Sequence, residues 1–238
     1  MYKINIHMTI FETWPTFCRG VIIAHNIDNR HVAPELMAEL QAVCEQASEE
    51  SIDLKMDNRI VDWDHAHIAF GSNPNRFPPA HKALRKRVQK PEVSLNPISA
   101  VISIMNVNSI RDVIPVGGDD LDTIPDTVEL KRATGDEVFV PLGQPDTVEH
   151  PEPGEVIYWH SDTGQVMCRR WNWRNSHVSR ISESTTSMLM NIDGLGEGSE
   201  ARALKTRNHV AEMLKQYCKA DVTLDLLSKE NPEVLVHS

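Results

Sequence analysis

The residues from Gly154 to Leu195 constrain the fold more than any other part of the chain. Two apolar-rich runs, Glu155 to His160 and Gln165 to Trp171, flank a short connection, Ser161 to Gly164. The Asp and Gly in this connection suit a tight turn between antiparallel strands, so these residues predict a β-hairpin. A third run, 184–192, places Thr186, Met188, Met190 and Ile192 with a period of two and predicts a further, largely buried strand.

The beginning of the chain predicts two strands followed by a helix. Residues 2–10 alternate apolar and mostly polar side chains, as in a strand with one buried face, and 20–24 form a continuous apolar run typical of a central strand. Pro34 stands at a plausible first helical position, and apolar residues recur at helical spacing as far as Ala47. Residues 51–79 are polar and rich in turn formers, so we expect a packed connection there.

A short basic helix is predicted from Pro78, with Leu84 and Val88 as its apolar stripe. It carries the densest run of cations in the chain: Lys82, Arg85, Lys86, Arg87 and Lys90. Basic runs are common on solvated helix faces, and that is one interpretation of this segment. The other is a local contact with RNA.

An apolar helix and a glycine-containing segment come next. Asn96-Pro97 supplies an N-cap and a first-turn proline, and 98–105 predicts a buried helix that ends near Asn106. The segment Pro115 to Asp122 contains Gly117-Gly118 followed by acids. Adjacent glycines let the backbone approach a ligand closely, and the acids after them could hold an amine or a ribose hydroxyl. An ordinary glycine turn with solvated acids is the alternative.

The remaining residues complete a mixed α+β chain. Residues 128–132 and 137–142 predict two strands, and apolar spacing from Ala203 to about Lys219 predicts an amphipathic helix. Hairpins without regular strand–helix alternation favour the α+β class. We expect one domain over residues 1–195 and a C-terminal helical extension, 196–238, packed on the same domain.

Composition limits the partners of the chain. Its 238 residues are 40% hydrophobic, which is enough to build a sizeable core. The net charge of -10, from 24 Lys and Arg against 34 Asp and Glu, argues against DNA as a partner and restricts any RNA contact to a local surface. There is no apolar stretch of the ~18 to 20 residues that a membrane helix needs, and no secretory signal pattern. We therefore expect a cytoplasmic protein without a membrane partner.

Motifs for common cofactors and nucleophiles are missing from the sequence. The four cysteines are scattered, with no Cys-x-x-Cys pair and no Cys-His cluster at metal-ligand spacing. The sequence also has no Gly-x-Ser-x-Gly elbow, no phosphate-binding glycine loop, no Gly-x-Gly-x-x-Gly and no His-Glu-x-x-His. We expect neither a metal ion nor another cofactor, and we expect the thiols to be reduced and mostly buried.

Four segments together resemble the editing module of the phenylalanyl-tRNA synthetase beta chain. The resemblance is closer to the free-standing relatives of that module, the solo B-three/B-four domain proteins. The segments are Phe70 to Val88, Pro115 to Asp122, Gly154 to Gly164 and Cys168 to Arg174. They occur in the order of the family, and the resemblance extends to Leu195. It implies layers of sheet, sheet and helix, and an activity that hydrolyses the ester of tyrosine misattached to tRNA.

The resemblance also implies where a site would lie. Gly117 stands where the synthetase pattern Pro-x-His-x-x-Asp has its pocket histidine, and Asn172 to Asn175 replace a small-residue run that lines the synthetase pocket. The candidate substrate-binding residues are Asn106, Gly117, Gly118, Asp120, Arg169 and Asn172. Arg174 is the candidate for stabilising an oxyanion, and His177 the candidate for orienting water. We expect Gly117, Asp120, Asn172 and Arg174 to meet at one concave site.

Two functional classes follow from these residues. The first is a hydrolase that binds tRNA through the basic helix, at Lys82, Arg85, Lys86 and Arg87, and removes a misattached amino acid in trans. The second is a non-catalytic binding module for an amino acid or a related small ligand. In that module Arg169, Arg174 and the Gly117-Gly118 backbone would hold a carboxylate or phosphate. A purely structural interpretation makes the arginines surface ion-pair partners and the tryptophans part of the core.

Overall fold

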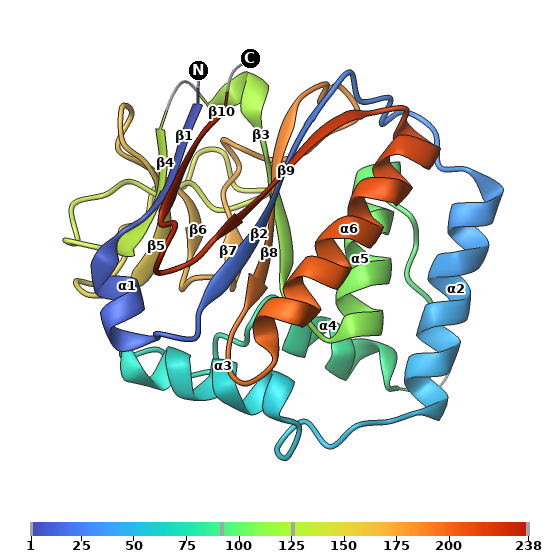
Figure 1. Ribbon diagram of the computed structural model, residues 1–238, viewed down its shortest axis with the longest axis horizontal. Helices are drawn as coiled ribbons and strands as arrows, with labels where there is room; N and C mark the ends of the chain where they lie inside the picture. Colours follow the sequence, from blue (N-terminus) through green and yellow to red (C-terminus); the bar gives the residue numbers. More distant parts are fainter. Residues whose placement is uncertain (1, 91–92, 125–126, 237–238) are drawn as a thin grey trace.

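Two β-sheets pack face to face, and helices cover the outer face of the smaller sheet (Figure 1). The computed structural model describes residues 2–90, 93–124 and 127–236. Buried side chains from both sheets form one core between them, and a second core lies between the smaller sheet and the helices. The predicted α+β class, with its sheet, sheet and helix layers, is confirmed.

The larger sheet has six strands in the order β10-β1-β4-β5-β6-β7. Their bounds are Glu233–Val236, Tyr2–Ile6, Thr127–Arg132, Val156–His160, Gln165–Arg169 and Arg174–Asn175. Strands β1 and β4 pair in parallel, and the other neighbours are antiparallel. The β5–β6 pair is the hairpin that the sequence predicts.

The smaller sheet has four antiparallel strands in the order β3-β8-β2-β9. Their bounds are Val116–Asp120, Met188–Gly194, Cys18–His25 and Asp221–Leu227. Strand β2 is central, as its continuous apolar run predicts. Gly117 and Gly118 are part of edge strand β3, so the segment is a strand rather than a turn.

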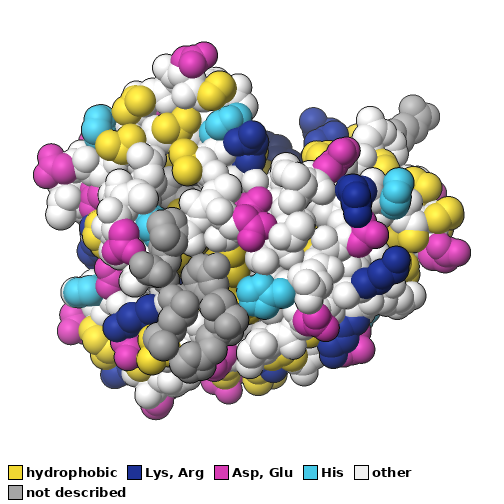
Figure 2. All heavy atoms as spheres, turned by 90° about the horizontal axis from the view of Figure 1, so that it is seen from above, with side chains coloured by type: hydrophobic (Ala, Val, Ile, Leu, Met, Phe, Trp, Pro, Cys, Tyr) yellow, Lys and Arg dark blue, Asp and Glu magenta, His cyan; other side chains and the backbone are white. Residues whose placement is uncertain are grey.

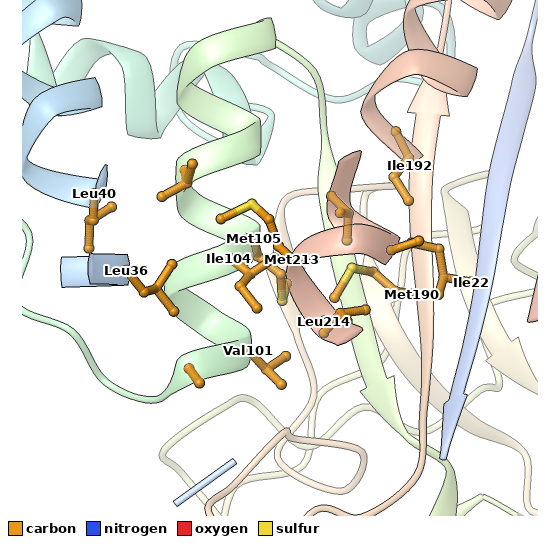
Figure 3. Close-up of a cluster of buried hydrophobic side chains, with 14 of the residues drawn as sticks. Ile22, Leu36, Leu40, Val101, Ile104, Met105, Met190, Ile192, Met213 and Leu214 are labelled. Atoms are coloured by element: carbon orange, nitrogen blue, oxygen red, sulfur yellow. The ribbon is translucent and has the colours of Figure 1, made fainter. Parts of the chain in front are cut away.

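The helices are α1 (Met8–Thr13), α2 (Pro34–Glu49), α3 (Asn58–Ala69), α4 (Ala80–Val88), α5 (Ala100–Asp112) and α6 (Ser199–Cys218), with a short 3-10 helix, η1 (Leu121–Thr123). Helices α5 and α6 pack directly on the smaller sheet, α2 and α4 pack on α5, and α1 packs on β4 of the larger sheet. In Figure 3, Val101, Ile104 and Met105 of α5 lie between Leu36 and Leu40 of α2 on one side and α6 and the sheet on the other. Among the described residues, no helix is long and apolar enough to cross a membrane.

Several predicted elements differ in the structure because local capping outweighs the apolar pattern. Residues Met8–Thr13 form a helix rather than the end of a strand, since the His7 side chain accepts a hydrogen bond from Thr9 N. Asp57 likewise caps α3, in a region predicted to be a connection. Helix α5 is capped by Ser99 instead of Asn96.

Two further predictions about the strands differ from the structure. Residues 137–142 make isolated bridges and no continuous strand. After α6, which the sequence predicts, the chain continues into β9 and β10, which pair with β2 and β1. The described part of the predicted extension, residues 196–236, therefore contains helix α6 and adds a strand to each of the two sheets.

Ile22 tests the core that joins the smaller sheet to the helices. Its side chain is fully buried, whereas Leu235 on β10 is 53% exposed. We expect Ile22→Ala to lower the free energy of unfolding by about 2–5 kcal/mol, because the lost methylene groups leave a cavity. Leu235→Ala should change it by less than about 0.5 kcal/mol. Urea denaturation of both variants measures this, and equal losses would contradict the assignment of the core.

Candidate functional site

A pocket of about 80 Å³ lies between the two sheets, at the β3 edge of the smaller one. Since one water molecule needs about 10–15 Å³ measured in this way, the pocket holds several waters or a small polar group. We call it the inter-sheet pocket. Its wall consists of Ala80, Pro115, Val116, Gly117, Gly118, Asp119, Tyr158, Cys168, Trp171, Asn172, Asn175, Asn191 and Asp193.

Strand register explains which side chains of the smaller sheet face this pocket. Residues directly opposite each other in an antiparallel pair share one face of the sheet. Gly117 lies opposite Asn191 in the β3–β8 pair, and Asp119 lies two residues further along β3 on the same face. A Cβ atom built on Gly117 would meet nothing within 4 Å, so the absence of a side chain there leaves open space.

Asp119 is the acid of the pocket whose charge changes near neutral pH. It is only 5% exposed, and its Oδ1 accepts a hydrogen bond of 2.6 Å from Ser179 Oγ. Burial raises the pKa of Asp119 to about 7, and the hydrogen bond from Ser179 opposes part of that rise. A carboxyl group with such a pKa can accept and return a proton at physiological pH.

Two amide side chains add a free donor and a free acceptor to the wall. Burial lowers the pKa of His67 to about 4, so its ring is neutral, and its Nε2–H donates to Asn172 Oδ1 over 3.1 Å. This contact orients the Asn172 amide. Within the part of the chain that the structure describes, Asn172 Nδ2 and Asn191 Oδ1 are buried atoms without a hydrogen-bond partner.

A buried ion pair within the smaller sheet lies beside these groups, and it is hydrogen-bonded to the larger sheet. Arg19 Nε donates to Asp193 Oδ1 over 2.8 Å, and both side chains are almost fully buried. Tyr158, from the larger sheet, donates its hydroxyl to Asp193 Oδ2 over 2.7 Å and accepts a hydrogen bond from Arg19. Trp171 Nε1 donates to the same carboxylate oxygen over 3.2 Å. Both carboxylate oxygens of Asp193 therefore accept hydrogen bonds from other residues.

A wider groove of about 360 Å³ adjoins the inter-sheet pocket, with Ala80 and Val116 as shared wall residues. We call it the outer groove. Arg87 and Trp173 line it. The Trp173 ring contacts Phe77 edge to face, with the ring centroids 4.7 Å apart. The groove therefore places an aromatic side chain and a cation next to the pocket.

Thiol and metal chemistry have little support at this site. All four cysteines are buried free thiols, and burial raises the pKa of the pocket residue Cys168 far above its usual range. In residues 2–90, 93–124 and 127–236, no group of three or more His, Cys, Asp and Glu is arranged to hold a metal ion.

The structure brings some of the predicted substrate-binding residues together and separates others. Gly117, Gly118 and Asn172 line the inter-sheet pocket. Asn106, on α5, lines the outer groove instead. Asp120 lies outside both, because its carboxylate caps η1 and accepts a hydrogen bond from Thr185.

The predicted arginine and histidine lie outside the pocket wall. Arg169 is buried in ion pairs of 2.8 Å with Glu149 and with Glu155. Arg174 makes a looser ion pair of 3.8 Å with Glu149. His177 Nδ1 accepts a hydrogen bond from the backbone N–H of Gly143. The expected meeting of Gly117, Asp120, Asn172 and Arg174 therefore holds for Gly117 and Asn172 alone.

The basic helix α4 presents fewer free cations than its sequence predicts. Arg85 is buried and donates to the backbone carbonyls of Glu50 and Ile110, so it forms no part of an exposed surface. Lys82 is held by an ion pair of 2.6 Å with Asp64. Lys86 and Arg87 remain exposed.

Sequence reasoning predicted Asn172 but missed three other polar residues of the pocket wall: Asp119, Asn191 and Asp193. Asp119 stands beside Asp120 in one motif, and only the alternation of a strand distinguishes the acid that faces the pocket from its neighbour. Asn191 and Asp193 sit in a run that reads as buried strand. Arg19 comes from a distant part of the chain, and no local pattern links it to Asp193.

Comparison with known proteins relates the chain to one family. The sequence profile of the B3/4 domain family matches residues 62–225. No curated protein matches the chain significantly. Among solved structures, it is similar to an N-terminal fragment of the phenylalanyl-tRNA synthetase beta-subunit from Pyrococcus horikoshii, with a TM-score of 0.48 and 13% identity. The similarity covers 92% of this chain and 49% of that one, so the chain spans about half of its length.

The raised pKa of Asp119 predicts a pH dependence of folding. The unfolded chain loses this proton near pH 4, whereas the folded chain keeps it until about pH 7, so the ionisation of Asp119 lowers stability as pH rises between these values. The free energy of unfolding of Asp119→Asn, relative to that of the wild type, should therefore increase as the pH rises from 5 to 8. Urea denaturation at several pH values measures this difference. Asp122→Asn, which removes an exposed carboxylate, controls for the loss of one charge. A pH-independent difference for Asp119→Asn would contradict the assignment.

Proposed function

The chain belongs to the B3/4 domain family, and from this membership we propose that it binds the aminoacyl end of a tRNA and hydrolyses the ester of a misattached amino acid in trans. One observation carries the proposal. The two segments that the sequence resemblance associates with an editing pocket, around Gly117 and around Asn172, line the same inter-sheet pocket although they are far apart in the chain.

In the proposed reaction, Asp119 is the general base. Its carboxylate takes a proton from a water molecule while the water oxygen attacks the ester carbonyl carbon and forms a tetrahedral intermediate. The intermediate collapses when the bond from carbon to the ribose oxygen breaks, and protonated Asp119 returns its proton to that oxygen. The products are the free amino acid and uncharged tRNA. Ser179 keeps the carboxylate in place through its hydrogen bond.

Asn172 is the proposed donor to the developing oxyanion. Its Nδ2 has no partner among the described residues, and the contact with neutral His67 fixes the amide so that this donor is ready before the reaction. Preorganised donors of this kind stabilise charge that appears in the transition state. The proposal thus gives to Asp119 and Asn172 the roles that sequence reasoning gave to His177 and Arg174.

The outer groove is the proposed position of the terminal nucleotide. Trp173 lines this groove and would stack with a base, and Arg87 lies on the groove wall where a phosphate would follow. A local contact suits this acidic chain, because Lys and Arg side chains are interspersed with Asp and Glu on the face shown in Figure 2. The tRNA contact is therefore restricted to Lys86 and Arg87 on α4.

A binding module for a free amino acid is the second candidate function. The unpartnered donor of Asn172 and acceptor of Asn191 would satisfy the carbonyl and amino groups of such a ligand equally well. This alternative differs from the first because it needs neither tRNA nor turnover.

Deacylation of a panel of mischarged tRNAs tests the proposed function. We expect the wild type to release at least one misattached amino acid, with a rate that rises with pH up to about 7 and then levels off, because Asp119 acts as the deprotonated base. Asp119→Asn should lower the rate on the order of a hundredfold or more. Asp122→Asn is the matched control. Full activity of Asp119→Asn would refute the base, and a wild type that binds amino acids but deacylates no tRNA would favour the binding module.

Replacing the free cations of α4 tests the proposed tRNA contact. Arg87→Ala and Lys86→Ala should each weaken tRNA binding and reduce the salt slope by about 1, since each removes one phosphate contact. Arg30→Ala removes an exposed cation from a different part of the chain and should leave binding unchanged. Filter binding at several salt concentrations measures both quantities. Equal effects of the three substitutions would exclude α4 as the contact.

A further inference from the structure

Asn191 carries a polar atom whose partner is missing from the chain. The residue lies on β8, between β3 and β2, and is only 5% exposed. No described residue donates a hydrogen bond to its Oδ1. Native proteins pair nearly all of their buried acceptors, so an acceptor without a donor in a pocket wall indicates that a ligand or water supplies the donor.

Open space adjoins this acceptor. Gly117 lies directly opposite Asn191, and a Cβ atom there would meet nothing within 4 Å. Cβ positions of opposite residues are about 5 Å apart, so a group that lies over Gly117 is within hydrogen-bond reach of the Asn191 amide. A larger residue at position 117 would fill the space that the ligand needs.

The charge of the pocket indicates which kind of ligand group donates a hydrogen bond to Asn191 Oδ1. Asp193 is neutralised by Arg19, with which it forms a buried ion pair. Asp119 forms none of the ion pairs found among the described residues, although the nearby Arg19 cation lowers its pKa, and it lies on the same face of β3 as Gly117. Once ionised, it makes the pocket negative, which favours a protonated amine over a neutral donor.

We infer that Asn191 accepts a hydrogen bond from the α-ammonium group of the acyl residue, held over Gly117, and that the site therefore requires a free α-amino group. This inference rests on the proposed function, and it makes Asn191 a specificity-determining residue rather than a catalytic one. Asn172 Nδ2 then meets the neighbouring carbonyl oxygen, so the two unpartnered amide atoms match the two polar groups of an aminoacyl ester.

The test compares substrates with and without the amine. Using a tRNA charged with an accepted amino acid and the same tRNA charged with its des-amino counterpart, we expect the wild type to prefer the aminoacyl form at least tenfold in kcat/KM. Asn191→Leu, which has a similarly branched but apolar side chain without the acceptor, should reduce the preference severalfold. Asn191→Asp keeps an acceptor at this position and should retain the preference for the aminoacyl form. Equal preference in wild type and Asn191→Leu would overturn the inference.

A binding experiment keeps the inference separate from the proposed hydrolysis. Amino-acid methyl esters and their des-amino counterparts are titrated into the wild type and Asn191→Leu by calorimetry, which needs neither tRNA nor turnover. Tighter binding of the amine-bearing esters to the wild type, lost in Asn191→Leu, supports the inference even if no tRNA is deacylated. Equal binding of both classes, or binding of neither, overturns it even if deacylation is found. Thermal unfolding of each variant confirms that it is folded.

Discussion

The ion pair between Arg19 and Asp193 is the interaction on which the site depends. It is buried between the two sheets, where removal of one partner would leave an uncompensated charge and cost several kcal/mol. Tyr158 and Trp171 bind the same carboxylate, so a strand of the larger sheet and the segment after β6 are held against β8. Tyr158, Trp171 and Asp193 also line the inter-sheet pocket, so this polar contact forms part of the pocket wall.

One face of the smaller sheet packs on the helices, and the other face lines the inter-sheet pocket. Met190 and Ile192 point toward the helices and belong to their core, while Asn191 and Asp193 face the larger sheet. Alternation along a single strand thus places a continuous apolar surface behind a row of polar groups. A wall built on paired strands suits a site that works with preorganised donors and acceptors.

The sequence predicted the architecture better than it predicted the site. The β5–β6 hairpin, central strand β2, helix α2 and the family follow from periodicity, turn chemistry and motif order, and all are confirmed. Gly117 and Asn172 reach the pocket as predicted because their motifs flank it. The rest depends on long-range pairing. Which of two adjacent acids faces the pocket is decided by the register of β3, and Arg19 meets Asp193 through the pairing of β2 with β8.

The central claim is that the inter-sheet pocket receives the acyl group of an aminoacyl ester. A crystal structure with a stable analogue, in which an amide links the amino acid to a 3′-amino-adenosine, tests it most directly. The account predicts the carbonyl oxygen at Asn172 Nδ2, the ammonium group over Gly117 at Asn191 Oδ1, and the adenosine in the outer groove beside Trp173. Ordered analogue bound elsewhere, with the inter-sheet pocket filled only by water, would contradict it.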